Sequence, residues 1–382
     1  MGPDRHSVRE IRALAGARAI PPLLLVLYHY HEAHGYQHLR WFDVIVSKGY
    51  LWVEFFFALS GFVLVHAYRS REKFRYLAFL KARLTRLYPL HLFTLLLMVG
   101  MILFFRWLAA LGNYVSIYDL PAYHPYTSFW SFIANLFLVQ AWHLFPRLSW
   151  NGVSWFVSVE WFLCLMFPIW LWISRRGVTA GVLAMAFGLL LLRALVSPRI
   201  GLDITFDWGV LRGIGDFAVG VGLAMLYGEW RERGERLPIE VVSIIQIAVF
   251  ALLVYALYAT GWAHSLRDYW VLPPMFALIF VLALDRGVLA KVFQSAPLMR
   301  LGEWSFAIYM GQTTFLQLLR VAEQRLYPNP PPSWTGAIHI LEPISLLILC
   351  ILWGAVLFYT VERPANAWLR KTWLNANRGT AA

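Results

Sequence analysis

The chain has 382 residues, of which 60% are hydrophobic and 17% aromatic, while only 14% carry a charge. A soluble domain is charged at about a quarter of its positions, so this composition excludes an ordinary soluble protein and indicates a polytopic membrane protein. The net charge of +12 lies mostly in short Lys and Arg runs between apolar segments. That pattern fits the positive-inside rule and contact with membrane lipids, and it argues against nucleic-acid binding. Cys164 and Cys350 fall inside apolar segments, so we expect neither a disulfide framework nor a metal site.

The first apolar segment, Ile11–His31, is long enough to cross a bilayer, which takes about 20 residues. It nevertheless contains Arg18 and His29, which on a helix would share a face roughly 16 Å apart. Pro21 and Pro22 lie between them and are expected to bend the helix. An ionisable residue inside a span indicates a functional site, although snorkelling of Arg18 and interfacial anchoring by His29 would also explain the pair. No small-residue cleavage site follows, so we expect a retained span and not a signal peptide.

A polar, histidine-rich loop separates this segment from a series of further apolar segments that predict an all-α transmembrane bundle. We expect these spans at Gly49–Tyr68, Pro89–Leu111, Val153–Ile173, Val178–Val196, Trp208–Tyr227, Ile239–Thr260, Tyr269–Asp285, Glu303–Val321 and Ile338–Thr360. The basic stretch Arg69–Arg86 is expected to form an amphipathic helix lying at the membrane interface.

The segment Phe129–Phe145 decides the topology. It is apolar but contains Asn135, Gln140 and His143, so it could be a span or a shorter re-entrant piece. If it does not cross, every basic loop falls on the side of the basic N-terminus, as the positive-inside rule requires. We therefore expect about ten spans with both termini cytoplasmic. They form a single membrane-embedded domain in residues 1–382, with spans over about 11–365 and no fused soluble domain.

Three ionisable residues are expected at similar depth in the outer half of the bundle. His29 ends the first span, Glu54 begins the second, and Glu160 lies about two turns into the fourth. An imidazole that accepts a hydroxyl proton, oriented by a carboxylate, is the arrangement that general-base catalysis needs. The alternative for each glutamate is a structural ion pair with Arg18, Arg193 or Arg212.

Arg83 and Arg86 form a second candidate site, on the inner side. Their spacing places both guanidinium groups on one face of a helix, where they could bind a phosphate-bearing ligand. Contact with lipid headgroups would explain the same spacing, and on spacing alone it is the better explanation.

Several sequence blocks together resemble the acyltransferase 3 family of integral-membrane O-acyltransferases, which modify bacterial glycans and some natural products. IRALAGARAIPPLLLVLYHYH is similar to the family's opening helix, in which an arginine precedes the catalytic histidine by eleven residues; these map to Arg18 and His29. WVEFFFALSGFVL resembles a second block and places Glu54 where Asp is common. ARLTRLYPLH resembles the segment associated with the acyl-CoA side and contains Arg83 and Arg86.

Later blocks follow in the family's order over nearly the whole chain. NGVSWFVSVEWFLCLMFP maps Trp155, Ser158 and Glu160, and LRGIGDFAVG maps Arg212. LGEWSFAIYMGQ maps Tyr309 but has Gln312 where a histidine is frequent, and VERP closes the domain. The resemblance implies that Trp155, Ser158, Arg212, Tyr309 and Gln312 contribute to the substrate site.

The resemblance also implies an activity and a location. An acyl group, most often acetyl, would pass from cytoplasmic acyl-CoA to a hydroxyl of a glycan, a lipid-linked sugar or a small molecule, in the bacterial inner membrane. His29 would be the general base and Arg18, Arg83 and Arg86 would bind the donor. Larger relatives carry a fused hydrolase-like domain, so this chain would act alone or with a separate periplasmic partner. We expect no metal cofactor, and direct transfer, because no Cys or Ser matches a nucleophile motif.

Two other classes of function compete with this interpretation. A transporter or flippase could use Arg18, His29 and the carboxylates as a substrate or proton path, but transporters commonly contain repeats and the sequence shows none. A scaffolding membrane protein would leave Arg18 and Glu160 inside the membrane without a function.

Overall fold

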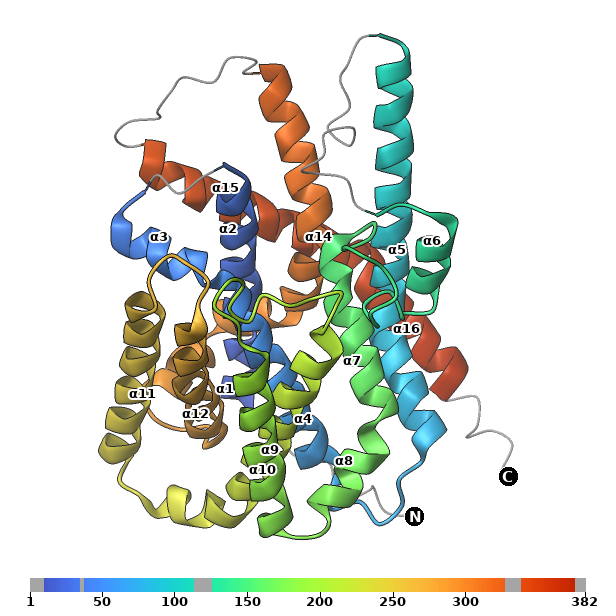
Figure 1. Cartoon of the computed structure of the whole chain (residues 1–382). Coiled ribbons are helices and arrows are strands. Elements are labelled where there is room, and N and C mark those ends of the chain that lie inside the picture. Colours follow the sequence, from blue (N-terminus) through green and yellow to red (C-terminus); the bar gives the residue numbers. More distant parts are fainter. Residues whose placement is uncertain (1–9, 35–37, 113–125, 327–337, 375–382) are drawn as a thin grey trace.

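The computed structural model describes residues 10–34, 38–112, 126–326 and 338–374. Within these ranges the chain is helical, and its β-pairing is limited to one isolated bridge between Ser197 and Gly201. This confirms the all-α prediction. The helices, labelled in Figure 1, are α1 (Arg12–Ala17), α2 (Ile20–His34), α3 (Arg40–Ser47), α4 (Trp52–Tyr68), α5 (Tyr76–Ala110), α6 (Phe129–Leu136), α7 (Trp155–Leu165), α8 (Phe167–Ser174), α9 (Val178–Leu195), α10 (Gly209–Arg236), α11 (Ile239–Ala259), α12 (Leu272–Ala283), α13 (Val288–Phe293), α14 (Ala296–Leu326), α15 (Ile338–Leu357) and α16 (Arg363–Leu369).

Seven helical stretches of the described chain are long and apolar enough to cross a membrane, and the bent pair α7–α8 makes an eighth if it counts as one span. The first predicted span is not among them, because it is divided into α1 and α2, of which the longer has 15 residues. The segment Glu303–Val321 lies within α14, which is 31 residues long but also falls outside this group. The protein is therefore a multi-pass membrane protein, and about ten spans remains a prediction.

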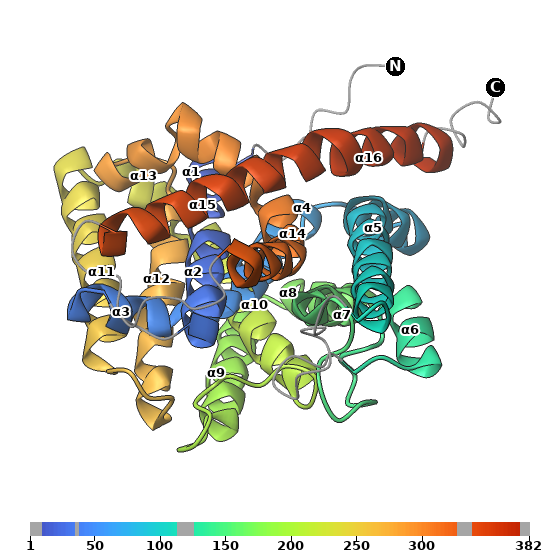
Figure 2. The ribbon, with the colours of Figure 1, turned by 90° about the horizontal axis from the view of Figure 1, so that it is seen from above.

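The last helical stretch is strongly inclined (Figure 2). It runs through α15 and α16 as 33 residues, Leu341–Trp373, and Figure 2 shows it crossing one side of the molecule obliquely while α5 is seen end-on. A helix of that length, about 50 Å, exceeds a hydrocarbon core of about 30 Å, so strong tilt is the expected accommodation.

The segment Phe129–Phe145 does not form a transmembrane helix. Its helical part, α6, has 8 residues and is therefore about 12 Å long, and the chain from Phe137 to Asn151 has no α-helix. The chain before α6 and the loop after it are joined by a hydrogen bond, which the Tyr126 N–H donates to the Leu148 carbonyl oxygen at 3.0 Å. A 12 Å helix cannot cross the bilayer, which supports the topology in which the basic loops share one side.

A reporter fusion tests this topology. A fusion after Arg176 is expected to read cytoplasmic, and one after Trp150 is expected to read extracytoplasmic, because the bent pair α7–α8 lies between them. The measurement is the activity of a dual phosphatase–galactosidase reporter at each site. A cytoplasmic reading at both sites would contradict the predicted arrangement.

The prediction of an interfacial helix at Arg69–Arg86 is wrong. From Tyr76 onward the basic stretch is the beginning of α5, which continues without a break through Pro89 for 35 residues. Proline at this point removes one backbone donor, but the helix on both sides is long enough to persist. Arg83 and Arg86 are therefore held by the same rigid element that crosses the bundle.

The predicted bend in the first segment is present. α1 ends at Ala17, α2 begins at Ile20, and Pro21 and Pro22 occupy the first turn of α2, where the missing N–H groups have no intrahelical partner to lose. α1 is wedged tightly against α14, since a Cβ at Gly302 would stand 2.2 Å from the Ala15 carbonyl oxygen. This contact fixes Arg18, which stands in the break between the two helices.

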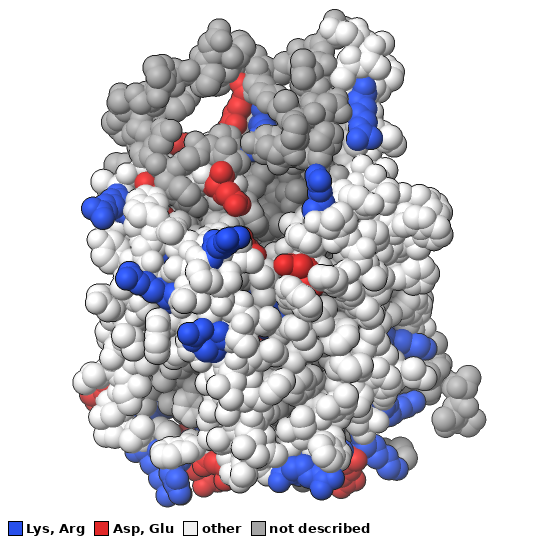
Figure 3. All heavy atoms as spheres, viewed as in Figure 1, with Lys and Arg blue, Asp and Glu red and all other residues white. Residues whose placement is uncertain are grey.

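The centre of the bundle is α10, which packs against α4 and α9 through glycines. A Cβ at Gly220 would stand 2.0 Å from the Ala58 carbonyl oxygen of α4, and one at Gly188 would stand 2.3 Å from the Gly215 carbonyl oxygen of α10. Small residues at such points let membrane helices approach closely. On the face shown in Figure 3, Lys and Arg gather along the lower edge together with acidic side chains, and further basic side chains lie higher on the same face.

Candidate active site

Two of the cavities in the bundle have Tyr309 of α14 in their lining. The arginine cavity lies between α4, α5, α7, α14 and the α1–α2 break, with about 780 Å³ of empty space that includes open solvent. Its charged lining is Arg18, Arg83, Arg86 and Glu160. The histidine cavity has about 1730 Å³ of empty space, and its polar lining includes His29, Glu32, Asp203, Gln312 and Arg320. The two cavities therefore share a wall.

The arginine cavity brings together the three arginines that the sequence singled out. Arg18 arrives from the α1–α2 break, and Arg83 and Arg86 from one face of α5. Across from them, Glu160 of α7 accepts a hydrogen bond from the Ser60 hydroxyl at 2.6 Å. A second carboxylate, Glu362, is nearly buried and interacts electrostatically with Arg18 and Arg86.

The lining of the arginine cavity contains three guanidinium groups and one carboxylate, so basic groups outnumber acidic ones there. Guanidinium groups bind phosphate through paired, charge-assisted hydrogen bonds. The arrangement therefore suits an anionic, phosphate-bearing ligand better than an apolar one.

In the histidine cavity, His29 of α2 contacts Gln312 of α14. The Gln312 Nε2 donates to the Tyr309 carbonyl oxygen at 3.0 Å, and this bond fixes the amide so that Oε1 lies 3.0 Å from His29 Nδ1. Because Oε1 can only accept, Nδ1 carries the ring hydrogen in the neutral imidazole. His29 Nε2 then holds the lone pair, which is the tautomer that a general base needs.

Glu54 does not contact His29. Its two carboxylate oxygens accept from Arg212 Nε at 3.1 Å and Nη2 at 2.7 Å, and both side chains are buried. Arg212 also donates to the backbone carbonyls of Tyr50 and Ile204, at 3.0 and 2.9 Å. The hypothesis that Glu54 orients His29 is therefore corrected: Glu54 forms the structural ion pair with Arg212 that was its alternative.

The hypothesis that Glu160 orients His29 does not fit the structure either. Glu160 lines the arginine cavity, whereas His29 lines the other one. It is the sixth residue of α7, and Tyr309, which lines both cavities, belongs to the wall between Glu160 and the histidine cavity. The residue that contacts the imidazole is Gln312.

The remaining predicted site residues divide into two groups. Trp155 and Tyr309 line the histidine cavity, and the Tyr309 hydroxyl donates to the Val153 carbonyl oxygen at 2.8 Å. Ser158 lines neither cavity, because its buried hydroxyl donates to the Leu138 carbonyl oxygen at 2.8 Å and accepts from the Ala141 N–H at 3.2 Å. Ser158 thus fastens the loop after α6, and a direct contact with substrate does not fit its position.

Sequence reasoning missed two acidic residues that line the histidine cavity and a third, Glu362, that interacts with arginines of the arginine cavity. Glu362 lies in the closing VERP block, which could have pointed to it, but that block was used only to mark the end of the domain. Glu32 lies three residues after His29 on α2, and Asp203 accepts from the Tyr28 hydroxyl at 3.3 Å. Asp203 comes from the loop before α10, and no local spacing connects it with His29.

Comparison with known proteins identifies the family of the chain. The model of the acyltransferase domain family Acyl_transf_3 matches residues 11–363. The acyltransferase MdmB of Streptomyces mycarofaciens is 29% identical over 358 residues, which is 84% of this chain and 81% of that protein. The O-acetyltransferase OatA of Staphylococcus aureus is 23% identical over 80% of this chain and 50% of its own length, so this chain spans about half of it.

A third relative, protein 2 in the picA locus of Rhizobium radiobacter, is 34% identical over 155 residues, covering 39% of this chain and 73% of that protein. No solved structure matches the chain significantly. The family model covers the α1–α2 break, both cavities and the Glu362 block within one continuous match. The chain belongs to the acyltransferase 3 family and is a multi-pass membrane acyltransferase.

Proposed function

We propose that this protein is an O-acyltransferase of the bacterial inner membrane, with about ten spans and both termini in the cytoplasm. The donor is cytoplasmic acyl-CoA, with acetyl as the expected group, and the acceptor is a hydroxyl of a glycan, a lipid-linked sugar or a small molecule. The observation that carries the proposal is the pair of cavities that share a wall at Tyr309. The arginine cavity is suited to phosphate, and the histidine cavity holds His29 in the tautomer in which Nε2 can accept a proton.

The donor binds with its phosphates toward Arg83 and Arg86, and its pantetheine arm extends past Arg18 toward the shared wall. Acyl-CoA is negatively charged at its nucleotide end and apolar along its arm, and the arginine cavity offers both environments. Phe56, Leu59, Leu87 and Phe156 supply its apolar lining.

The acceptor enters the histidine cavity. His29 Nε2 removes the hydroxyl proton as the oxygen attacks the thioester carbonyl carbon, and the C–S bond breaks to release the CoA thiolate. The proton on His29 then passes to the thiolate or to solvent, which restores the base. Gln312 keeps the imidazole in its reactive orientation.

The donor site is tested by Arg83→Ala and Arg86→Ala. Each is expected to weaken acyl-CoA binding about tenfold or more, because one charge-assisted phosphate contact is worth about 1.5–3 kcal/mol. The measurement is the Kd of the detergent-solubilised protein for a non-hydrolysable acyl-CoA analogue. Arg231→Ala is the control, since Arg231 is an exposed arginine of α10 paired with Glu235. Equal affinity in all variants would assign Arg83 and Arg86 to lipid contact.

The positioning of His29 is tested by Gln312→Leu. Loss of the Nδ1 contact should lower kcat about tenfold, because the free energy of one hydrogen bond corresponds to a rate change of about that size. The KM for acyl-CoA should stay unchanged. Gln312→His, which restores the residue frequent in the family, should recover part of the loss. A rise in KM with constant kcat would show that Gln312 binds substrate and does not orient the base.

The activity itself is tested with radiolabelled acetyl-CoA. The purified protein should release free CoA thiol and move label to a hydroxylated acceptor, and the double variant Arg83→Ala/Arg86→Ala should do so more slowly. An acceptor extract from the producing membrane supplies the hydroxyl. Uptake of label into proteoliposomes without thioester cleavage would instead support a transporter.

A further inference from the structure

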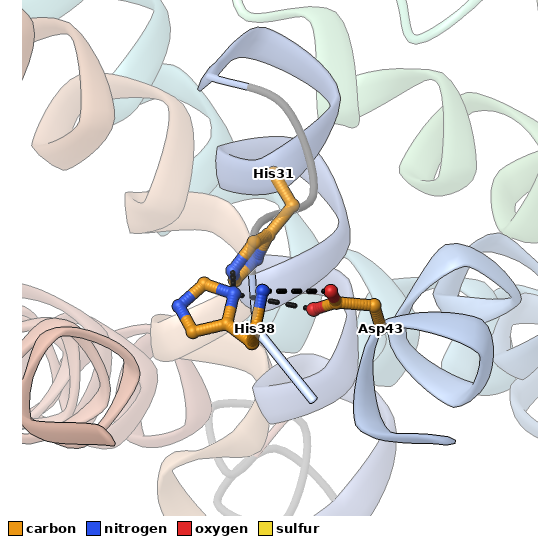
Figure 4. A group of neighbouring side chains, drawn as sticks. All are labelled: His31, His38 and Asp43. Carbon is orange, nitrogen blue, oxygen red and sulfur yellow. Dashed lines mark hydrogen bonds and ion pairs between the residues drawn. The ribbon is translucent and has the colours of Figure 1, made fainter. Parts of the chain in front are cut away.

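A second cluster of ionisable side chains lies at the facing ends of α2 and α3, outside both cavities. His31 Nε2 lies 3.1 Å from His38 Nδ1, and His38 Nδ1 lies 3.2 Å from Asp43 Oδ1. Figure 4 shows the three side chains pointing toward one another, with His31 on α2, Asp43 on α3 and His38 between the helices. One ligand atom from each lies within 4.8 Å of the others. Nothing in the acyl-transfer mechanism uses this cluster.

The three side chains present atoms that can ligate a metal. His31 Nδ1 lies 2.7 Å from the Leu27 carbonyl oxygen, which can only accept, so the ring hydrogen of a neutral His31 is on Nδ1 and Nε2 offers a lone pair. Asp43 Oδ1 offers lone pairs as well. His38 Nδ1 lies close to both of these atoms, at 3.1 and 3.2 Å.

A second carboxylate influences His38 from its other side. His38 Nε2 lies 3.5 Å from Glu342 Oε2 of α15, and the Tyr30 hydroxyl donates to Glu342 Oε1 at 2.6 Å. A neutral His38 with its hydrogen on Nε2, on the side of this carboxylate, presents Nδ1 as a third ligand atom beside His31 Nε2 and Asp43 Oδ1.

We propose that His31 Nε2, His38 Nδ1 and Asp43 Oδ1 bind a Zn²⁺ ion. A tetrahedral zinc with bonds of about 2.0–2.1 Å has neighbouring ligand atoms about 3.3 Å apart, and the two measured contacts are close to this value. Two imidazoles and a carboxylate select a transition metal over Ca²⁺ or Mg²⁺, which prefer oxygen. Water takes the fourth position.

The surroundings of the cluster resemble the outer shell of known zinc sites. The other ring nitrogen of each histidine faces an oxygen: His31 Nδ1 lies 2.7 Å from the Leu27 carbonyl oxygen, and His38 Nε2 lies 3.5 Å from the Glu342 carboxylate. Such partners orient ligating imidazoles and fix their tautomers. The His38 N–H also donates to Asp43 Oδ2 at 2.8 Å, which aims Oδ1 at the ring. The ion would tie α2 to α3 two residues beyond His29, and so stiffen the helix that carries the base. The sequence had suggested no metal, because the ligands have none of the familiar Cys or His spacings.

The test is the zinc content of the whole chain, purified through an affinity tag without histidines, stripped with a chelator, reloaded with ZnCl₂ and desalted. Mass spectrometry should find about one zinc per chain in the wild type and less than a tenth of that in His38→Gln and Asp43→Asn. Glu342→Gln should retain the site with affinity about 10–100-fold weaker. His91→Gln is the matched control, since His91 is a buried histidine of α5 that contacts the Asn135 carbonyl oxygen.

X-ray absorption at the zinc edge keeps the proposal testable if a ligand variant fails to fold. The wild type should show two imidazole nitrogens and oxygen at about 2.0–2.2 Å, with no sulfur. Zinc should also raise the Tm of the wild type and of His91→Gln but not of folded His38→Gln. No zinc retained by the wild type, equal zinc in all variants, or sulfur at the absorption edge would overturn the site, whether or not acyl transfer is observed.

Discussion

A His29→Ala variant is expected to lose acyl transfer by about 10²–10⁴-fold while it still binds acyl-CoA, because a positioned general base contributes that much to a rate. The structure supports this expectation through the Nδ1 contact with Gln312, which leaves Nε2 as the proton acceptor in the histidine cavity. The donor site lies in the other cavity, so its affinity should not change. Initial rates with labelled acetyl-CoA and the Kd of a donor analogue, measured on the same preparation, separate the two effects.

His66→Ala is the matched control for this variant. His66 is a partly buried histidine near the end of α4, where its ring stacks on Phe62 at 6.0 Å, and it lines neither the arginine nor the histidine cavity. Its rate should stay within about twofold of the wild type, as for other substitutions outside the reacting groups. Near-normal transfer by well-folded His29→Ala protein would remove the general base from the mechanism while leaving the family assignment intact.

The parts of the fold that hydropathy determines could be predicted from the sequence. The helices α4, α9, α11 and α12 lie where the apolar segments predicted them, because a bilayer-spanning helix needs a continuous apolar run. The basic beginning of α5 was predicted incorrectly. Charge in Arg69–Arg86 resembles an interfacial helix, but in the fold Arg83 and Arg86 turn inward to a cavity, where their charge is compensated by Glu160.

The sequence predicted which arginines gather in the candidate site, but it did not predict which residue contacts His29. Arg18, Arg83 and Arg86 were grouped as donor-binding residues, and the structure brings them to one cavity. The partner of His29 was not predictable, because Gln312 is 283 residues away and only the packing of α2 against α14 brings them together. Pairs so far apart in the chain have no characteristic spacing in the sequence. Only the fold could therefore show whether Glu54, Glu160 or a third residue contacts His29.

The largest stability effect is expected at the pair Glu54–Arg212. Both side chains are almost fully buried, with 0% and 1% of the side-chain surface exposed, and the pair links α4 to α10. Glu54→Gln would leave the Arg212 guanidinium charged without its partner, and breaking a buried pair in this way costs about 3–5 kcal/mol. The measurement is the free energy of unfolding in mixed micelles, followed by circular dichroism.

The exposed pair Arg231–Glu235 on α10 provides the control, with an N–O distance of 2.8 Å and about half of each side chain exposed. Glu235→Gln should cost about 0–1 kcal/mol, because solvent screens the charges. The double variant Glu54→Leu/Arg212→Met should recover much of the loss of Glu54→Gln, since removing both charges also removes the cost of burying them. If Glu54→Gln costs no more than Glu235→Gln, the buried pair does not stabilise the fold. The presence of both buried charges would then have to be explained by the lining that Arg212 gives to the histidine cavity.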